Sequence, residues 1–355
     1  MQLRYAREEL LRSHDWTREH VVAGHRLHGG FDADGVYVPP RALVRGPAIA
    51  AWTDALRKRG GDLLPADASL LTGERGTNEA QQKLLLQEGL GQTFWNLLTI
   101  TGVIEARGRL LAELAFPSFA EAVVEPVDDL AIGHLNGGLL EAHGWDEGGQ
   151  PAEPERSEGG ERARGERSSP ILGGHDVMWF AIRDLAFGAV DHPFPEIPER
   201  IGRPEEESVL VPEIANRFER TIAFLMNLLL IEFRAELNFR LTEDLLRDPE
   251  LFADRRAQAL EAAEVVGRIR TDEAIHVESL RLYLGELASL TFRGRDGGRI
   301  DGAVVIDRLW SGIVRWWTVE QPPLAAAQQR AIMRERILRH ADGARILARY
   351  EALAD

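Results

Sequence analysis

Four long stretches of this chain repeat their apolar residues at the spacing of an α-helix. They cover about residues 77–114, 119–143 and 213–241, and a last stretch that begins after Pro249 and ends near Leu290. A 3.6-residue period over such lengths predicts helices that each bury one face. Because these helices can pair as two hairpins separated by a longer connection, the sequence predicts an all-α fold built on a four-helix bundle.

The segments around these helices set the expected domain boundaries. We expect residues 1–75 to form an N-terminal extension, residues 76–290 to form the bundle and residues 291–355 to add shorter C-terminal helices. Within the bundle, residues 146–170 contain, Pro aside, no apolar residue larger than Ala. Such a composition cannot bury enough surface to order itself, so it predicts a flexible surface insertion. A short helix is expected after it, at about residues 173–187.

Composition excludes several classes of function. The chain has 42 Lys and Arg against 57 Asp and Glu, and this net charge of -15 argues against nucleic acid or an anionic membrane as a partner. It contains no Cys, so thiolate metal sites and cysteine nucleophiles are excluded, and any metal must bind His, Asp or Glu. The N-terminus lacks the apolar core of a signal peptide, and no apolar run reaches the roughly 20 residues that span a bilayer. We therefore expect a cytoplasmic protein.

The last of the four helices contains a pair of residues with metal-ligand spacing. Glu273 and His276 are three residues apart, so both project from the same face of a helix. Other long helices here also carry a carboxylate on an apolar face. Burying several unpaired carboxylates together costs several kcal/mol each or forces their protonation, and a metal ion is the simplest compensating charge.

A bundle of long helices that carries a Glu-x-x-His pair resembles the ferritin-like di-iron carboxylate proteins, and the match covers about residues 77–290. The resemblance implies one lone carboxylate from the first helix, Glu88, and one from the third, Glu232. It implies that Glu273 and His276 are the pair of the fourth helix. Distances from the first hairpin turn place Glu88 and Glu141 at similar heights, which makes Glu141 the expected carboxylate of the second pair.

The second pair departs from the family pattern, because Gly144 and not His stands three residues after Glu141. His143 or His175 could supply the missing imidazole, and we favour His175 slightly. His134 lies about 10 Å from Glu141 along the helix axis, too far to share an ion, and suits an outer position.

The carboxylate of the third helix also has alternatives. Glu232 follows the apolar run from Ile222 to Ile231, Glu236 lies one turn further on the same face, and hairpin geometry favours Glu219. We interpret Glu105 as a solvated or locally paired acid. The segment Asp32-Ala-Asp34-Gly35 resembles the start of a calcium loop but lacks its later carboxylates, so we interpret it as a turn.

The resemblance implies an oxygen-activating di-iron oxidoreductase, an oxygenase or oxidase, with two iron ions as cofactor and manganese as an alternative. Its partners would be dioxygen, a small organic substrate and an electron-donor protein. The aromatic C-terminal helices are compatible with a homodimer. Two alternatives remain: a metal-free helical scaffold or interaction protein, and a di-manganese or iron-handling ferritin-like protein.

Overall fold

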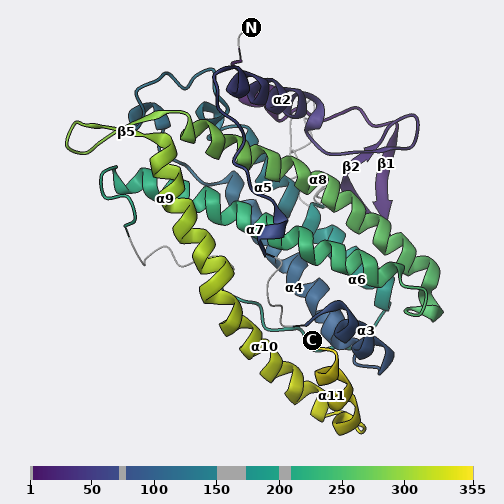
Figure 1. Cartoon of the computed structure of the whole chain (residues 1–355). Helices are drawn as coiled ribbons and strands as arrows, with labels where there is room; N and C mark the ends of the chain where they lie inside the picture. Colours follow the sequence, from purple (N-terminus) through teal and green to yellow (C-terminus); the bar gives the residue numbers. More distant parts are fainter. Residues whose placement is uncertain (1–2, 72–76, 150–172, 200–208, 355) are drawn as a thin grey trace, which may run out of the picture.

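The computed structural model of the chain describes residues 3–71, 77–149, 173–199 and 209–354 (Figure 1). Over these residues the chain is mostly helical, as the all-α prediction requires. The central helices are α4 (Gln92–Gly108), α5 (Leu139–Gly148), α6 (His175–Phe187), α7 (Asn216–Arg247) and α8 (Arg256–Ala288). α7 packs along α8, α8 along α6, and α4 along both α5 and α6.

α6 begins directly beside the end of α5, although residues 150–172 separate the two helices in the sequence. A Cβ atom at Gly174, the residue before α6, would lie 2.4 Å from the Gly149 amide nitrogen and 2.6 Å from the Glu147 carbonyl oxygen. Asp146 and Glu147, which the sequence prediction placed in a flexible insertion, are buried residues of α5. The rest of that prediction lies outside the described residues.

Glycines divide the first two expected helices. Residues 77–114 form α3 (Glu79–Gln87) and α4, with Gly89 between them at φ +77° in the left-handed region. Residues 119–143 are largely irregular, with 3₁₀ turns at Phe119–Glu121 and Ala131–His134 before α5 begins. Gly137, at φ +98°, lies two residues before α5, and Pro126 lacks the amide that a helix interior needs.

The N-terminal extension contains a small antiparallel sheet that the sequence pattern did not predict. Its strands are β1 (Arg18–Val22), β2 (His25–Phe31) and β3 (Tyr37–Val38), between the helices α1 (Arg7–Leu10) and α2 (Ala42–Lys58). A two-residue turn at Ala23–Gly24, both with positive φ, joins β1 to β2, as is usual for tight hairpins.

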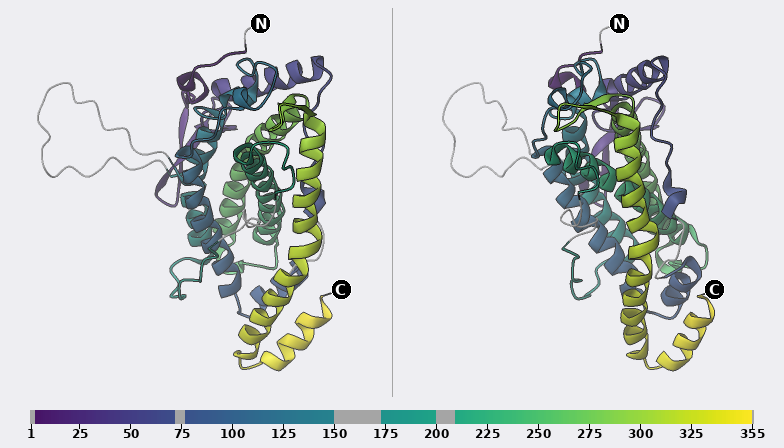
Figure 2. Two further views of the ribbon diagram at one scale, coloured as in Figure 1. Left: turned by 90° about the vertical axis from the view of Figure 1, so that its left-hand side faces the viewer. Right: turned by 60° about the vertical axis from the view of Figure 1, so that its left-hand side comes forward.

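The C-terminal segment runs along the outside of the central helices (Figure 2). A hairpin of β4 (Thr291–Arg293) and β5 (Arg299–Asp301) leads into α9 (Gly302–Arg315), a π-helical turn, α10 (Gln321–Leu338) and α11 (Gly343–Ala352). Trp317 in the π-helical turn is buried and donates a hydrogen bond of 3.1 Å to the Asn227 side chain of α7. It serves as a packing anchor. Within the described ranges, no helix combines the length and apolar character needed to cross a bilayer.

Candidate metal centre

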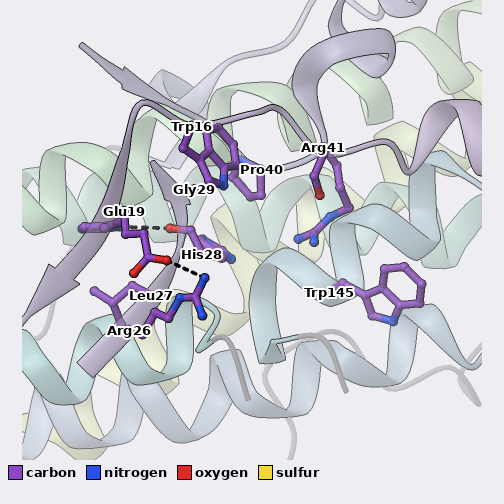
Figure 3. A pocket seen from close by; sticks show the side chains of 11 residues that line it. Trp16, Glu19, Arg26, Leu27, His28, Gly29, Pro40, Arg41 and Trp145 are labelled. Atoms are coloured by element: carbon purple, nitrogen blue, oxygen red, sulfur yellow. Dashed lines mark hydrogen bonds and ion pairs between the residues drawn. The ribbon is translucent and has the colours of Figure 1, made fainter. Parts of the chain in front are cut away.

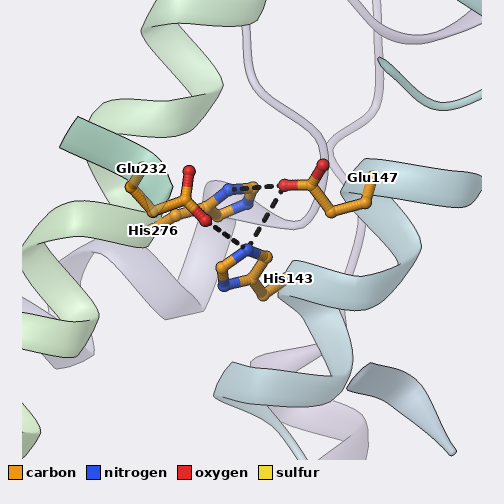
Figure 4. A group of neighbouring side chains, drawn as sticks. All are labelled: His143, Glu147, Glu232 and His276. Carbon is orange, nitrogen blue, oxygen red and sulfur yellow. Dashed lines mark ion pairs between the residues drawn. The ribbon is translucent and has the colours of Figure 1, made fainter. Parts of the chain in front are cut away.

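Seven buried His and Glu side chains converge between α4, α5, α6, α7 and α8, and we call them the central cluster. They form two overlapping groups, in each of which four ligand atoms lie within 4.8 Å of one another. The first group is His143, Glu147, Glu232 and His276 (Figure 4), and the second is Glu105, Glu147, His175 and Glu273. Since a transition-metal ion lies about 2.0 to 2.2 Å from its N and O donors, each group has the dimensions to hold a metal ion.

Two glutamates link the groups, because each directs one oxygen to either side. Glu273 Oε2 lies 2.7 Å from His276 Nδ1, and its Oε1 lies 3.1 Å from His175 Nδ1. Glu147 Oε1 lies 3.2 Å from His276 Nδ1, and its Oε2 lies 3.7 Å from His175 Nδ1. Glu105 and Glu232 each belong to one group only. The cluster therefore has two neighbouring positions with two shared carboxylates.

Two buried aspartates orient the histidines in a crossed arrangement. Asp146 precedes Glu147 in α5 and lies 3.1 Å from His276 Nε2 on α8. Asp272 precedes Glu273 in α8 and lies 3.1 Å from His175 Nε2 on α6. A carboxylate at Nε2 favours a proton there and leaves the Nδ1 lone pair directed at the cluster, as in many metal sites.

The N-terminal extension completes this outer layer. Arg41 and Arg45 both donate to Asp146, the latter over 2.7 Å, while His28 Nε2 and the Tyr37 hydroxyl reach Asp272 at 3.1 and 2.9 Å. His28 and Arg41 also line a pocket of about 50 Å³ between the N-terminal sheet and α5 (Figure 3). The side of the centre that faces the sheet is therefore closed by ordered polar groups.

Electrostatics within the cluster reflect the crowding of buried carboxylates. Burial, followed by the charges of Glu105 and Glu273, raises the pKa of Glu147 well above its usual range. Burial and the Glu273 charge raise the pKa of Glu232 to about 7. Burial alone would lower the pKa of His276, but the surrounding carboxylates outweigh it and raise that pKa to about 10. Protons bound to these side chains thus balance the negative charge of the cluster, which a bound cation could balance instead.

Two imidazole nitrogens of the central cluster lack a hydrogen-bond partner, which supports the presence of a cation within the cluster. His143 Nε2 and His175 Nδ1 are buried and have no hydrogen-bond partner of acceptable geometry, although carboxylate oxygens lie 3.0 and 3.1 Å away. Buried nitrogens without partners are rare because they cost free energy. A metal ion between these nitrogens and the carboxylates would satisfy both, so the residues present fit such an ion.

The structure brings five of the eight predicted ligands together: His143, His175, Glu232, Glu273 and His276. Both histidines that the sequence left as alternatives lie in the cluster.

The structure places the other three predicted ligands elsewhere, each with arginine. Glu88, in the break before α4, pairs with Arg345 and Arg349 of α11. Glu141 pairs with Arg7. Glu236 accepts two hydrogen bonds from Arg270 at 2.7 and 3.0 Å.

Glu105 and Glu147 are cluster members that the sequence interpretation missed. Glu105 of α4 was interpreted as a solvated or locally paired acid, whereas it is buried in the cluster. The first hairpin is not formed by two continuous helices, so heights counted from its turn did not place Glu105 correctly. Glu147 was assigned to the insertion. The sequence feature that could have identified Glu147 is a repeated Asp-Glu pair, Asp146-Glu147 and Asp272-Glu273. Each pair supplies one linking glutamate and one outer aspartate.

The remaining sequence candidates have structural roles. Glu219 accepts hydrogen bonds from the backbone amides of Leu210 and Val211. His134 packs against Trp52 rather than in the outer layer of the cluster. Asp32 accepts hydrogen bonds from the amides of Asp34 and Val36, as expected for a turn.

Comparisons of the chain with protein-family models, with curated proteins and with solved structures gave no match.

Proposed function

We propose that the central cluster binds two divalent metal ions and that the protein is an oxygen-activating oxidoreductase of the ferritin-like di-metal type. The observation that carries this proposal is the pair of linking glutamates, Glu147 and Glu273, whose two oxygens each face a different group. A carboxylate in this arrangement can bridge two ions, which a single-ion site does not require.

The charge of the cluster glutamates also supports the binding of two divalent ions. Glu105, Glu147, Glu232 and Glu273 carry four negative charges when ionised, and two divalent ions would neutralise them. Asp146 is balanced separately by Arg41 and Arg45. A buried centre close to neutrality avoids the desolvation cost of uncompensated charge.

The arrangement of helices supports the ferritin-like part of the proposal. α4 supplies Glu105, α7 supplies Glu232 and α8 supplies Glu273 with His276, as bundles of this type distribute their ligands. The remaining helix corresponds to α5 and α6 together, with Glu147 at the end of one and His175 at the start of the other.

The donor set favours iron, with manganese as the alternative. Four carboxylates and three imidazoles suit iron and manganese, and no thiolate is present to favour softer ions. When bound, such a pair of ions supplies the redox chemistry by which dioxygen oxidises an organic substrate. The protein's residues hold the ions, fix the imidazole orientations through Asp146 and Asp272, and exclude bulk water by burial.

Metal analysis tests the proposal directly. Protein produced with iron supplied should contain about two ions per chain, and Glu273→Ala and His276→Ala should each lower this content severely, because a direct donor is lost. Glu278→Ala is the matched control, since Glu278 is exposed on the same helix two residues past His276.

The competing interpretation is a metal-free helical scaffold, in which the cluster is held by protons and ion pairs. A content below roughly 0.2 iron or manganese per chain in every preparation would establish that interpretation instead. Dioxygen consumption by the iron-loaded protein, absent from the Glu273→Ala variant, would then support the redox part of the proposal.

A further inference from the structure

The two positions of the central cluster differ in their donors. One position, which we call imidazole-rich, has His143, His276 and Glu232 as its own residues. The other, which we call carboxylate-rich, has Glu105, Glu273 and His175. Glu147 belongs to both groups, so each position has four residues, with two imidazoles in the imidazole-rich position and one in the carboxylate-rich position. Glu273 Oε2 also lies 2.7 Å from His276 Nδ1.

His143 is the additional imidazole that distinguishes the imidazole-rich position, and it is buried within the site. It is 3% exposed, and its ring stacks on that of His276 with centroids 3.8 Å apart and an interplanar angle of 11°. Its Nε2 lies 3.0 Å from Glu232 Oε1 and 3.3 Å from Glu147 Oε1 without forming a hydrogen bond (Figure 4).

The local structure explains why this imidazole reaches the cluster. His143 lies four residues before Glu147, so α5 presents both on one face a single turn apart. Gly144 permits α5 to approach the 3₁₀ turn Arg109–Ala112 that follows α4, because a Cβ there would lie 2.5 Å from the Ala112 amide nitrogen. The spacing that departs from the family's Glu-x-x-His pattern thus brings in a third imidazole.

Resting on the proposed function, we propose that His143 makes the two metal positions unequal, so that the first metal ion occupies the imidazole-rich position. Imidazole is a suitable donor for first-row transition ions such as iron, zinc and nickel, so the position with two imidazoles binds such ions more tightly at equal geometry. The carboxylate-rich position, with one imidazole, fills second.

Cobalt(II) is a suitable probe because it accepts the same donors. Metal-free protein is titrated with Co(II) by calorimetry, and crystals grown with one equivalent are analysed by anomalous scattering at the cobalt edge. We expect two separable binding steps, with the first ion between His143 and His276. His143→Ala should weaken the first step at least about tenfold and bring the two affinities together.

His175→Ala is the matched control, because it removes one imidazole from the carboxylate-rich position. It should weaken the second step and leave the first unchanged. Circular dichroism checks that both variants keep their helix content.

Equal occupancy of the two positions at one equivalent, or first occupancy of the carboxylate-rich position, would overturn the inference while leaving the two-metal proposal intact. The same holds if His143→Ala binds both ions as the wild type does. Absence of any Co(II) binding to the wild type would instead remove the proposed function on which the inference rests.

Discussion

Asp272, like Asp146, receives hydrogen bonds from three side chains. His28, His175 and Tyr37 all reach its Oδ2 atom, at distances of 2.9 to 3.1 Å. Burial alone would raise its pKa, but the hydrogen bonds from the two histidines outweigh this and lower the pKa. An ionised Asp272 keeps the proton of His175 on Nε2, which leaves Nδ1 free to face the carboxylate-rich position.

Replacing this aspartate should therefore weaken metal binding without removing a ligand. We expect Asp272→Asn to lower the affinity for Mn(II) or Co(II) about 10 to 100-fold, the usual effect of losing an outer partner of a metal-bound histidine. Calorimetric titration measures the affinity, and circular dichroism checks the fold. Asp129→Asn is the control, since Asp129 is exposed and pairs with Arg4. Unchanged affinity in Asp272→Asn would show that Asp272 does not orient His175.

At the scale of elements, the junction of α5 and α6 determines whether the site forms. Glu147 and His175 stand on opposite sides of this junction, and the linking role of Glu147 requires both to face one point. Gly174 makes the approach possible because its missing side chain leaves room for the backbone of α5.

We expect Gly174→Ala to destabilise the protein and to lower its metal content. The new methyl group would lie within 2.4 to 2.6 Å of backbone atoms of Asp146, Glu147 and Gly149, so a helix end must shift. Overpacking of this kind costs about 1 to 3 kcal/mol. Urea denaturation and metal analysis measure the two effects.

Gly267→Ala provides the matched substitution, because Gly267 lies within α8 and the nearest atom of another helix, Glu243 Oε1, is 4.0 Å from its Cβ position. Alanine there should be neutral or stabilising by about 0.5 to 1 kcal/mol, as expected in a helix interior. Equal stability of the two variants would contradict the close packing of the junction.

The elements also explain what the sequence could predict. Periodicity located α7 and α8, so Glu232, Glu273 and His276 were found, because an uninterrupted helix fixes which residues share a face. The choice of Glu88 failed for the opposite reason. It assumed a continuous helix from 77 to 114, whereas Gly89 ends α3 and rotates Glu88 toward α11.

Tertiary contacts account for the remaining errors. Glu147 adjoins a low-complexity segment, and only the packing of α5 against α4 and its 3₁₀ extension makes it a buried helical residue. The outer partners His28, Tyr37 and Arg41 lie more than 100 residues from the aspartates that they contact. Neither periodicity nor local spacing carries such information.

At the scale of the whole molecule, the N-terminal extension and the central helices form one structural unit around the centre. Trp52 and Leu56 of α2 belong to the same apolar core as Leu225 and Leu284 of the central helices. The extension also supplies the two arginines that neutralise Asp146. The centre is therefore closed only when residues far apart in the chain have folded together, which couples metal affinity to global stability.

This coupling predicts that metal binding raises the melting temperature. An ion at 100 times its dissociation constant stabilises the folded state by about 2.7 kcal/mol, which corresponds to a rise of roughly 4 °C for a protein of this size. The metal-free form should respond to Glu273→Ala with a lower melting temperature, because His175 and His276 hold the pKa of Glu273 well below its usual range and the substitution leaves these buried imidazoles without their partner. In that variant, added metal should give little rise. Calorimetric scans of wild type, Glu273→Ala and the exposed-site control Glu278→Ala, each with chelator and with Mn(II), separate these effects. If the wild type melts at the same temperature in both conditions, the buried carboxylates are balanced by protons alone and the metal centre is refuted.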